Sequence, residues 1–282
     1  MTQFERATDY DDRTTKAVYA VLLEIGQVLG AYRDKFVVIG GSVPWLLFPD
    51  AEQRHLGTMD VDLCLDAEAL GDGEYAHLIA LLDGAGYRRG EDDQKKFQLK
   101  RTFDPGDGRL ITVVVDLLMP REANFTKNKP PLIHDFAVQK ADGAEIAMRL
   151  HVDVELEGRM PDGRQNHLSI RVASVPALLV MKGYAIVGRD KKKDPYDIYY
   201  SIREFKGGHI ELAKACSPIL ADPIAMKAFK NIGGKFRNAD DFGPKTVRMF
   251  LEGSDQMGGM TPAQLENDAY RQVRAWLSQL GL

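Results

Sequence analysis

Hydrophobic and polar positions follow two different patterns along this chain. In the first part, segments with helical spacing alternate with segments of strand-like alternation. The elements expected there are a helix over 14–32, a strand over 35–40, a helix from Ser42, a strand over 58–66, a helix over 75–87, a hairpin of strands 95–103 and 109–118, and two further strands within 143–174.

The second part of the chain is dominated by helical patterns. Helices are expected over 175–189 and over 194–205, the latter with Asp194 as N-cap, and a Thr-x-x-Gln capping box at Thr261 predicts the start of the last one. The predicted fold class is therefore α+β, with a mixed β-sheet flanked by helices in residues 1–172 and a mainly helical domain in residues 173–282.

Composition and charge narrow the class of protein. Of the 282 residues, 44% are hydrophobic and 28% are charged, which is typical of a folded globular protein. No apolar run approaches the ~20 residues of a membrane span, the N-terminus is polar, and the two cysteines and six histidines lack metal-binding spacing. We therefore expect a cytoplasmic protein without membrane contact, in a reducing compartment, and we expect the histidines to be incidental. A net charge of −4 excludes a general attraction to nucleic acid.

Three aspartates lie in the expected strands. Residues two apart on a strand share a face, so Asp60 and Asp62 are expected side by side, where their repulsion requires a cation or a proton. Asp116 ends a β-branched run, where an ionised side chain needs a partner. Three such carboxylates on neighbouring strands are typical of phosphoryl chemistry with two magnesium ions, or with manganese in their place. The alternative is that these side chains simply face water.

A glycine turn precedes these acids. Gly40, Gly41 and Ser42 join a strand to a helix, and glycine lets a backbone approach a ligand closely. The turn is either a tight connection or a phosphate cradle, in which the Ser42 hydroxyl contacts a phosphate or metal as well as capping the helix.

The order of these motifs resembles the nucleotidyltransferase fold of the polymerase-beta superfamily: a hydrophobic strand, Gly-Gly-Ser, a spacer, Asp-x-Asp and a distant third carboxylate. The spacer of 17 residues between Ser42 and Asp60 is longer than the commonest form. The resemblance implies that residues 1–172 form the catalytic domain. It implies catalysis and metal binding by Asp60, Asp62 and Asp116, and nucleotide binding by Gly40, Gly41 and Ser42.

A second resemblance lies in the helical part. Residues 181–200, Met-Lys-Gly-Tyr-Ala-Ile-Val-Gly-Arg-Asp-Lys-Lys-Lys-Asp-Pro-Tyr-Asp-Ile-Tyr-Tyr, are similar to the motif of AbiEii-type nucleotidyltransferases, the toxins of type IV toxin–antitoxin systems. The resemblance implies that Lys182 is a catalytic-site lysine and that Arg189, Lys193 and Asp197 bind the nucleotide. The run contains an extra lysine relative to that motif. The alternative is a solvated loop between two helices.

Together the resemblances imply an enzyme of the EC 2.7.7 class that moves an NMP from an NTP to a hydroxyl of a tRNA or a protein side chain, with a cognate antitoxin as a further partner. Toxicity does not follow from the motif. The alternatives are a small-molecule nucleotidyltransferase of the antibiotic type and a non-catalytic nucleotide-binding protein that kept the fold.

Overall fold

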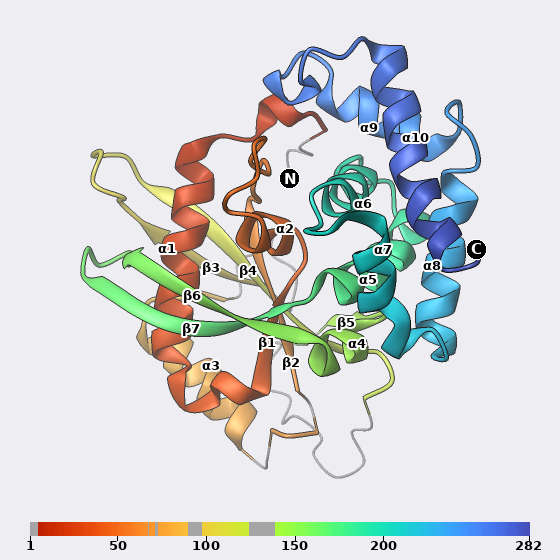
Figure 1. The fold of residues 1–282 in the computed structure, drawn as a ribbon. Helices are drawn as coiled ribbons and strands as arrows, with labels where there is room; N and C mark the ends of the chain where they lie inside the picture. The colour runs from red at the N-terminus through yellow and green to blue at the C-terminus, as the bar shows by residue number, and fades with distance from the viewer. Residues whose placement is uncertain (1–4, 67, 71–72, 90–97, 124–138) are drawn as a thin grey trace. The chain divides into compact units, whose positions relative to one another are not determined.

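The chain forms two compact units in a computed structural model that describes residues 5–66, 68–70, 73–89, 98–123 and 139–282 (Figure 1). The first unit comprises Met1–Asp11, Leu47–Leu56 and Val175–Leu282, and the second comprises Asp12–Leu46 and Gly57–Ser174. Two short early segments thus group with the late helices, which the sequence did not indicate. The catalytic and helical roles assigned to residues 1–172 and 173–282 stay predictions.

The second unit contains a mixed sheet in the spatial order β3-β4-β2-β1-β7-β6, with β5 paired to β4 as well. Its strands are β1 (Phe36–Ile39), β2 (Asp60–Leu65), β3 (Gln98–Phe103), β4 (Ile111–Pro120), β5 (Gln139–Ala141), β6 (His151–Arg159) and β7 (Gln165–Ala173). The pairs β1–β7, β2–β4 and β4–β5 are parallel, while β1–β2, β3–β4 and β6–β7 are antiparallel. The predicted α+β class with a mixed sheet is confirmed.

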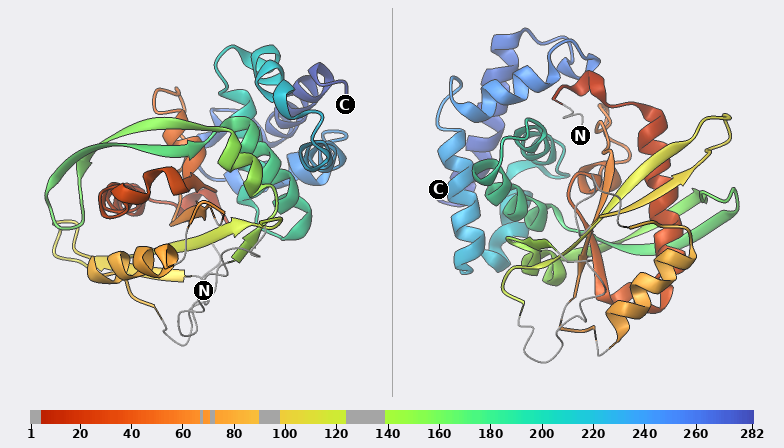
Figure 2. Two further views of the ribbon diagram at one scale, coloured as in Figure 1. Left: turned by 90° about the horizontal axis from the view of Figure 1, so that it is seen from below. Right: turned by 180° about the vertical axis from the view of Figure 1, so that it is seen from behind.

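Helix α1 lies in the hollow of this curved sheet, where it contacts β2, β4, β6 and β7 (Figure 2). The other helices of the unit are α2 (Ser42–Leu47), α3 (Glu74–Gly84) and α4 (Ala144–Arg149), beside α1 (Asp12–Val28) and the 3-10 turn Gly30–Lys35. Helix α4 contacts β1, β2, β4 and β7. The sheet is therefore flanked by helices, as predicted.

Two stretches of the second unit differ from their prediction or lie outside the described residues. Residues 143–174 were expected to hold only strands, but α4 occupies their beginning, because Ile146 and Ala147 fall on a buried helical face before β6 starts. The expected strand 95–103 is described from Gln98 onward. Residues 124–135, whose sequence Asn-Phe-Thr-Lys-Asn-Lys-Pro-Pro-Leu-Ile-His-Asp predicts a loop, lie outside the described part.

The first unit is helical, as predicted for the late part of the chain. Its helices are α5 (Val175–Gly188), α6 (Lys193–Arg203), α7 (Gly208–Cys216), α8 (Pro223–Lys235), α9 (Phe242–Leu251) and α10 (Pro262–Gln279), with 3-10 turns at Ala7–Asp9, Ser217–Ile219 and Asp255–Met257. The capping box of α10 is confirmed, since Thr261 Oγ1 accepts a hydrogen bond from Gln264 N and Gln264 Oε1 accepts one from Thr261 N.

Helix α6 is the central helix of this unit. It contacts α5, α7, α9 and α10, and every residue from Lys193 to Ile202 is buried. The predicted N-cap role of Asp194 is wrong, because the helix begins one residue earlier and the Asp194 carboxylate bonds to cationic side chains instead. Within the part of the chain that the structure describes, no helix has the length and hydrophobicity to cross a bilayer.

Candidate functional site

The pairing of β2 with β4 determines where the predicted carboxylates lie. These strands run parallel, with Asp62 opposite Asp116 and Asp60 opposite Val114. Paired residues of neighbouring strands point to the same face, and so do residues two apart on one strand. Asp60, Asp62 and Asp116 therefore share one face of the sheet; the sequence predicted this for Asp60 and Asp62 and placed Asp116 on a neighbouring strand.

This face is the one turned away from α1. Arg101 on β3 points toward α1, since its guanidinium bonds to both carboxylate oxygens of Glu24. Arg101 pairs with Val113, which places the alternate positions of β4, including Asp116, on the other face. Gln98 is the partner of Asp116 on β3, so Asp62, Asp116 and Gln98 form a row across three adjacent strands.

Gly40 gives the Asp62 carboxylate the space it occupies. A Cβ built on Gly40 would lie 1.9 Å from Asp62 Oδ2, and the glycine has a φ of +73°, which L side chains rarely adopt. The sequence left open whether this turn is a tight connection or a phosphate cradle, and the family resemblance implied nucleotide binding by Gly40. In the structure its immediate neighbour is a carboxylate of the site itself.

Ser42 lies at the first position of α2, where an N-cap role was expected. The helix starts at Ser42 itself, and its hydroxyl is buried at 1% exposure without a hydrogen-bond partner among the described residues. A buried hydroxyl without a partner is unusual, because the missing bond costs free energy. No hydrogen bond within the described residues therefore competes with the predicted contact of the Ser42 hydroxyl with a phosphate or metal, and this contact stays a prediction.

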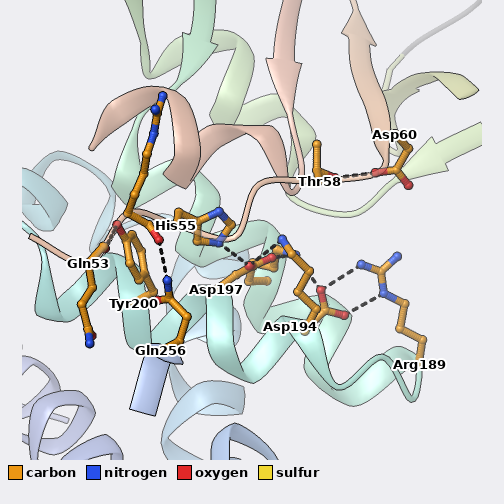
Figure 3. Close-up of polar contacts among 12 residues, drawn as sticks. Gln53, His55, Thr58, Asp60, Arg189, Asp194, Asp197, Tyr200 and Gln256 are labelled. Atoms are coloured by element: carbon orange, nitrogen blue, oxygen red, sulfur yellow. Dashed lines mark hydrogen bonds and ion pairs between the residues drawn. The ribbon is translucent and has the colours of Figure 1, made fainter. Parts of the chain in front are cut away.

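Two buried neutral side chains bond to the acids of this face. Thr58 Oγ1 donates to Asp60 Oδ1 at 2.7 Å (Figure 3), and Gln98 Nε2 donates to Asp116 Oδ1 at 2.8 Å. Neither Thr58 nor Gln98 was singled out from the sequence.

Within the described ranges, no group of three or more His, Cys, Asp or Glu side chains is arranged to hold a metal ion.

The predicted residues of the helical part form a buried network of opposite charges (Figure 3). Lys182 Nζ lies 2.6 Å from Asp194 Oδ1 and 2.6 Å from Asp197 Oδ2. Lys193 Nζ donates to Asp197 Oδ1 at 2.8 Å, and Arg189 bonds to both oxygens of Asp194. Lys182, Lys193 and both aspartates are at most 5% exposed, while the Arg189 side chain is 53% exposed. The structure thus brings these five residues together, and Arg189 alone among them reaches solvent.

His55 belongs to the same network, although the sequence gave no sign of it. Its Nε2 lies 3.0 Å from Asp197 Oδ1, and both side chains are fully buried. The imidazole stacks on Tyr196, with ring centroids 5.1 Å apart, and meets the edge of Tyr200. Because 142 residues separate His55 from Asp197, no local motif joins them. The expectation that the histidines are incidental is wrong for His55.

Burial and charge act on this network in opposite directions. Burial, with the charge of Lys193, lowers the pKa of His55 to about 4, so the ring is neutral near pH 7 and donates to Asp197. Burial disfavours ionised Asp197, but the charges of Lys182 and Lys193 hold its pKa well below the usual range. Burial would lower the pKa of Lys182, but both aspartates raise it above its usual value. Both aspartates and Lys182 are therefore ionised, and the two carboxylates face three basic side chains.

Comparisons with known proteins show a limited similarity in fold between this chain and two solved structures. No protein-family model matches the sequence, and no curated protein does. The chain is similar to the solved structure of an antigenic nucleotidyltransferase-like protein from Paracoccidioides brasiliensis, at 13% identity and a TM-score of 0.48, covering 84% of this chain and 94% of that chain. It is also similar to JHP933 from Helicobacter pylori, at 11% identity and a TM-score of 0.47, covering 96% and 95%. These scores assign no activity to the chain.

The buried His55 gives the protein a defined pH dependence. Between pH 6.5 and about 4 the unfolded chain binds a proton at His55 and the folded chain does not. The free energy of unfolding is therefore expected to fall as the pH drops through this range. His55→Gln keeps an amide donor for Asp197 and removes the titrating group, so urea unfolding at several pH values should show a shallower decline. The matched control is His167→Gln, at an exposed histidine. Equal slopes in wild type and His55→Gln would contradict the assignment.

Gly40 provides a test of the contact with Asp62. Alanine at Gly40 is expected to destabilise the protein by about 1–3 kcal/mol from backbone strain and by a further ~1–3 kcal/mol because Asp62 must move. Gly163→Ala is the matched control, since Gly163 has a φ of +82° but nothing within 4 Å of an added Cβ. Thermal unfolding measures both. In an Asp62→Ala background the cost of Gly40→Ala should approach that of Gly163→Ala, and an undiminished cost would refute the contact.

Proposed function

We propose that the protein is a metal-dependent nucleotidyltransferase, which moves an NMP from an NTP to an acceptor hydroxyl. The observation that carries the proposal is the placement of Asp62 and Asp116 at paired positions on one face of the sheet, with Asp60 on the same face. Two like charges on adjacent strands are unfavourable unless a cation or a proton compensates them. The space at Gly40 holds the Asp62 carboxylate against the first residue of the Gly-Gly-Ser turn.

The paired carboxylates of Asp62 and Asp116 are the part of the site that fits magnesium or manganese, since no group of three acids is arranged around an ion among the described residues. These ions prefer carboxylate oxygens, and magnesium is commonly held by one or two carboxylates together with substrate phosphates and water. Asp62 and Asp116 supply two neighbouring carboxylates, and in the proposal Asp60 joins them as third ligand by a movement of its side chain. When bound, the two ions supply positive charge that polarises the phosphate and activates the acceptor hydroxyl.

The residues of this chain have separate roles in the proposed transfer. Gly41 and the Ser42 hydroxyl bind the β- and γ-phosphates. The acceptor oxygen forms a bond to the α-phosphorus, the α–β anhydride bond breaks, and pyrophosphate leaves with its electron pair. Asp116 accepts the hydroxyl proton as general base. Each new bond is thus matched by one that breaks.

The helical unit contributes less directly in this proposal. Arg189 is the half-exposed cation of its network, so of these residues it is the one whose side chain is accessible to a nucleotide phosphate. The ammonium of Lys182 is buried and bound to two carboxylates. A direct contact of Lys182, Lys193 or Asp197 with the nucleotide stays a prediction, and it requires these ion pairs to exchange partners.

The acceptor follows only from the family resemblance. In the proposal the acceptor is a tRNA or a protein side chain, and the reaction takes place in the cytoplasm. The resemblance further suggests a toxin role of the AbiEii type, with a cognate antitoxin as partner. A small-molecule acceptor is the alternative that the experiment below separates.

Label transfer tests the proposed function. The purified protein is incubated with each α-³²P-labelled NTP, with Mg²⁺ or Mn²⁺, and with total tRNA or cell protein. Wild type is expected to label one acceptor class, and Asp62→Asn/Asp116→Asn to reduce labelling by more than ~100-fold, since outer groups around a metal alone contribute 10–100-fold. The matched control is Asp153→Asn, at an exposed carboxylate of β6.

Three outcomes are informative. Labelling that persists in the double variant would place the chemistry elsewhere. Metal-dependent NTP binding without labelled macromolecules would favour a small-molecule acceptor. The absence of both labelling and NTP binding would refute the proposed function.

A further inference from the structure

We propose that Thr58 and Gln98 are positioning residues that orient Asp60 and Asp116 for a divalent cation. This inference rests on the proposed function and extends it to two side chains that no motif in the sequence marks. Each side chain donates a short hydrogen bond to one carboxylate oxygen, and each comes from a different part of the sheet.

Thr58 stands two residues before the start of β2 and is 4% exposed. Its hydroxyl donates to Asp60 Oδ1 at 2.7 Å. The β-branched threonine has few χ1 states, and a buried hydroxyl loses free energy when it makes no hydrogen bond. The hydroxyl therefore restricts the rotation of the Asp60 carboxylate, and its bond occupies one of the two carboxylate oxygens.

Gln98 donates a hydrogen bond to Asp116 in the same way, from the neighbouring strand β3. It is the first residue of β3, is 5% exposed and pairs with Asp116 across the antiparallel ladder. Its Nε2 donates to Asp116 Oδ1 at 2.8 Å. An ionised carboxylate only accepts hydrogen bonds, so the amide must present its NH₂ group, and this fixes the orientation of both side chains.

Thr58 and Gln98 differ in chemical type from the donors that bond to the acids of the helical unit. Asp194 and Asp197 bond to Lys182, Lys193 and Arg189, whose charges offset theirs. Thr58 and Gln98 are neutral, so their hydrogen bonds orient the carboxylates without offsetting the negative charge. A group that orients a ligand but preserves its charge is what a cation site requires from its surroundings.

Manganese binding measures this role without relying on turnover. Free Mn²⁺ is followed by its paramagnetic resonance signal during titration of wild type, Thr58→Val, Thr58→Ser and Gln98→Leu. Valine and leucine keep the approximate shape and remove the donor, so each is expected to weaken binding by ~10–100-fold. Thr58→Ser restores the hydroxyl and is expected to bind nearly as wild type does. Thermal unfolding reports whether each variant is folded.

Thr102→Val is the matched control. The Thr102 hydroxyl bonds to Thr112 on an exposed part of the β3–β4 pair, so its loss is expected to leave Mn²⁺ affinity unchanged. Unchanged affinity in folded Thr58→Val and Gln98→Leu would overturn the inference, provided Asp62→Asn/Asp116→Asn abolishes binding, and would leave the proposed function intact. Equal weakening by Thr58→Val and Thr58→Ser would also overturn it. Wild type that binds no Mn²⁺ would overturn both.

Discussion

The parallel register of β2 and β4 sets Asp62 opposite Asp116, and the chemistry proposed for this protein depends on that pairing. Side chains alternate between the two faces of a sheet, so a slip of one residue would turn Asp116 toward α1 and its apolar packing. Burying an unpaired carboxylate there would cost several kcal/mol. The hydrophobic face thus enforces the register, and the register in turn brings the two acids together.

A different constraint governs the acids of the helical unit. Helix α6 has no exposed residue between Lys193 and Ile202, so Asp194 and Asp197 require partners. Their partners are the cations Lys182, Lys193 and Arg189. Asp197 also accepts a hydrogen bond from the neutral His55, which belongs to the early segment Leu47–Leu56. Removing one partner of a buried pair leaves an uncompensated charge, typically at a cost of 3–5 kcal/mol. Breaking any one pair of this network is therefore expected to destabilise the unit.

Local pattern was sufficient for much of the fold. Alternation of period two places Asp60 and Asp62 on one face, and the apolar run before Asp116 identifies its strand, but the face of Asp116 relative to Asp62 depends on the pairing of β2 with β4. The mixed sheet, the helical second part and the Thr261 capping box followed from the same signals. These features depend on residues close in sequence, where spacing alone carries the information.

The remainder depends on contacts between distant residues. The segment Lys-Lys-Asp-Pro-Tyr-Asp has the composition of a solvated helix start, and its burial is set by the neighbouring helices rather than by its own pattern. His55 meets Asp197 across 142 residues, and Gln98 meets Asp116 through strand pairing, so neither has a local signature. The role of Gly40 was also hidden, because the side chain that occupies its space comes from another strand.

Anomalous diffraction from crystals grown with Mn²⁺ tests the central claim most directly. The account predicts an anomalous peak within coordinating distance, ~2.0–2.6 Å, of carboxylate oxygens from both Asp62 and Asp116, and its loss in Asp62→Asn/Asp116→Asn crystals. A fully occupied peak elsewhere, or none beside these two residues at saturating Mn²⁺, would contradict it.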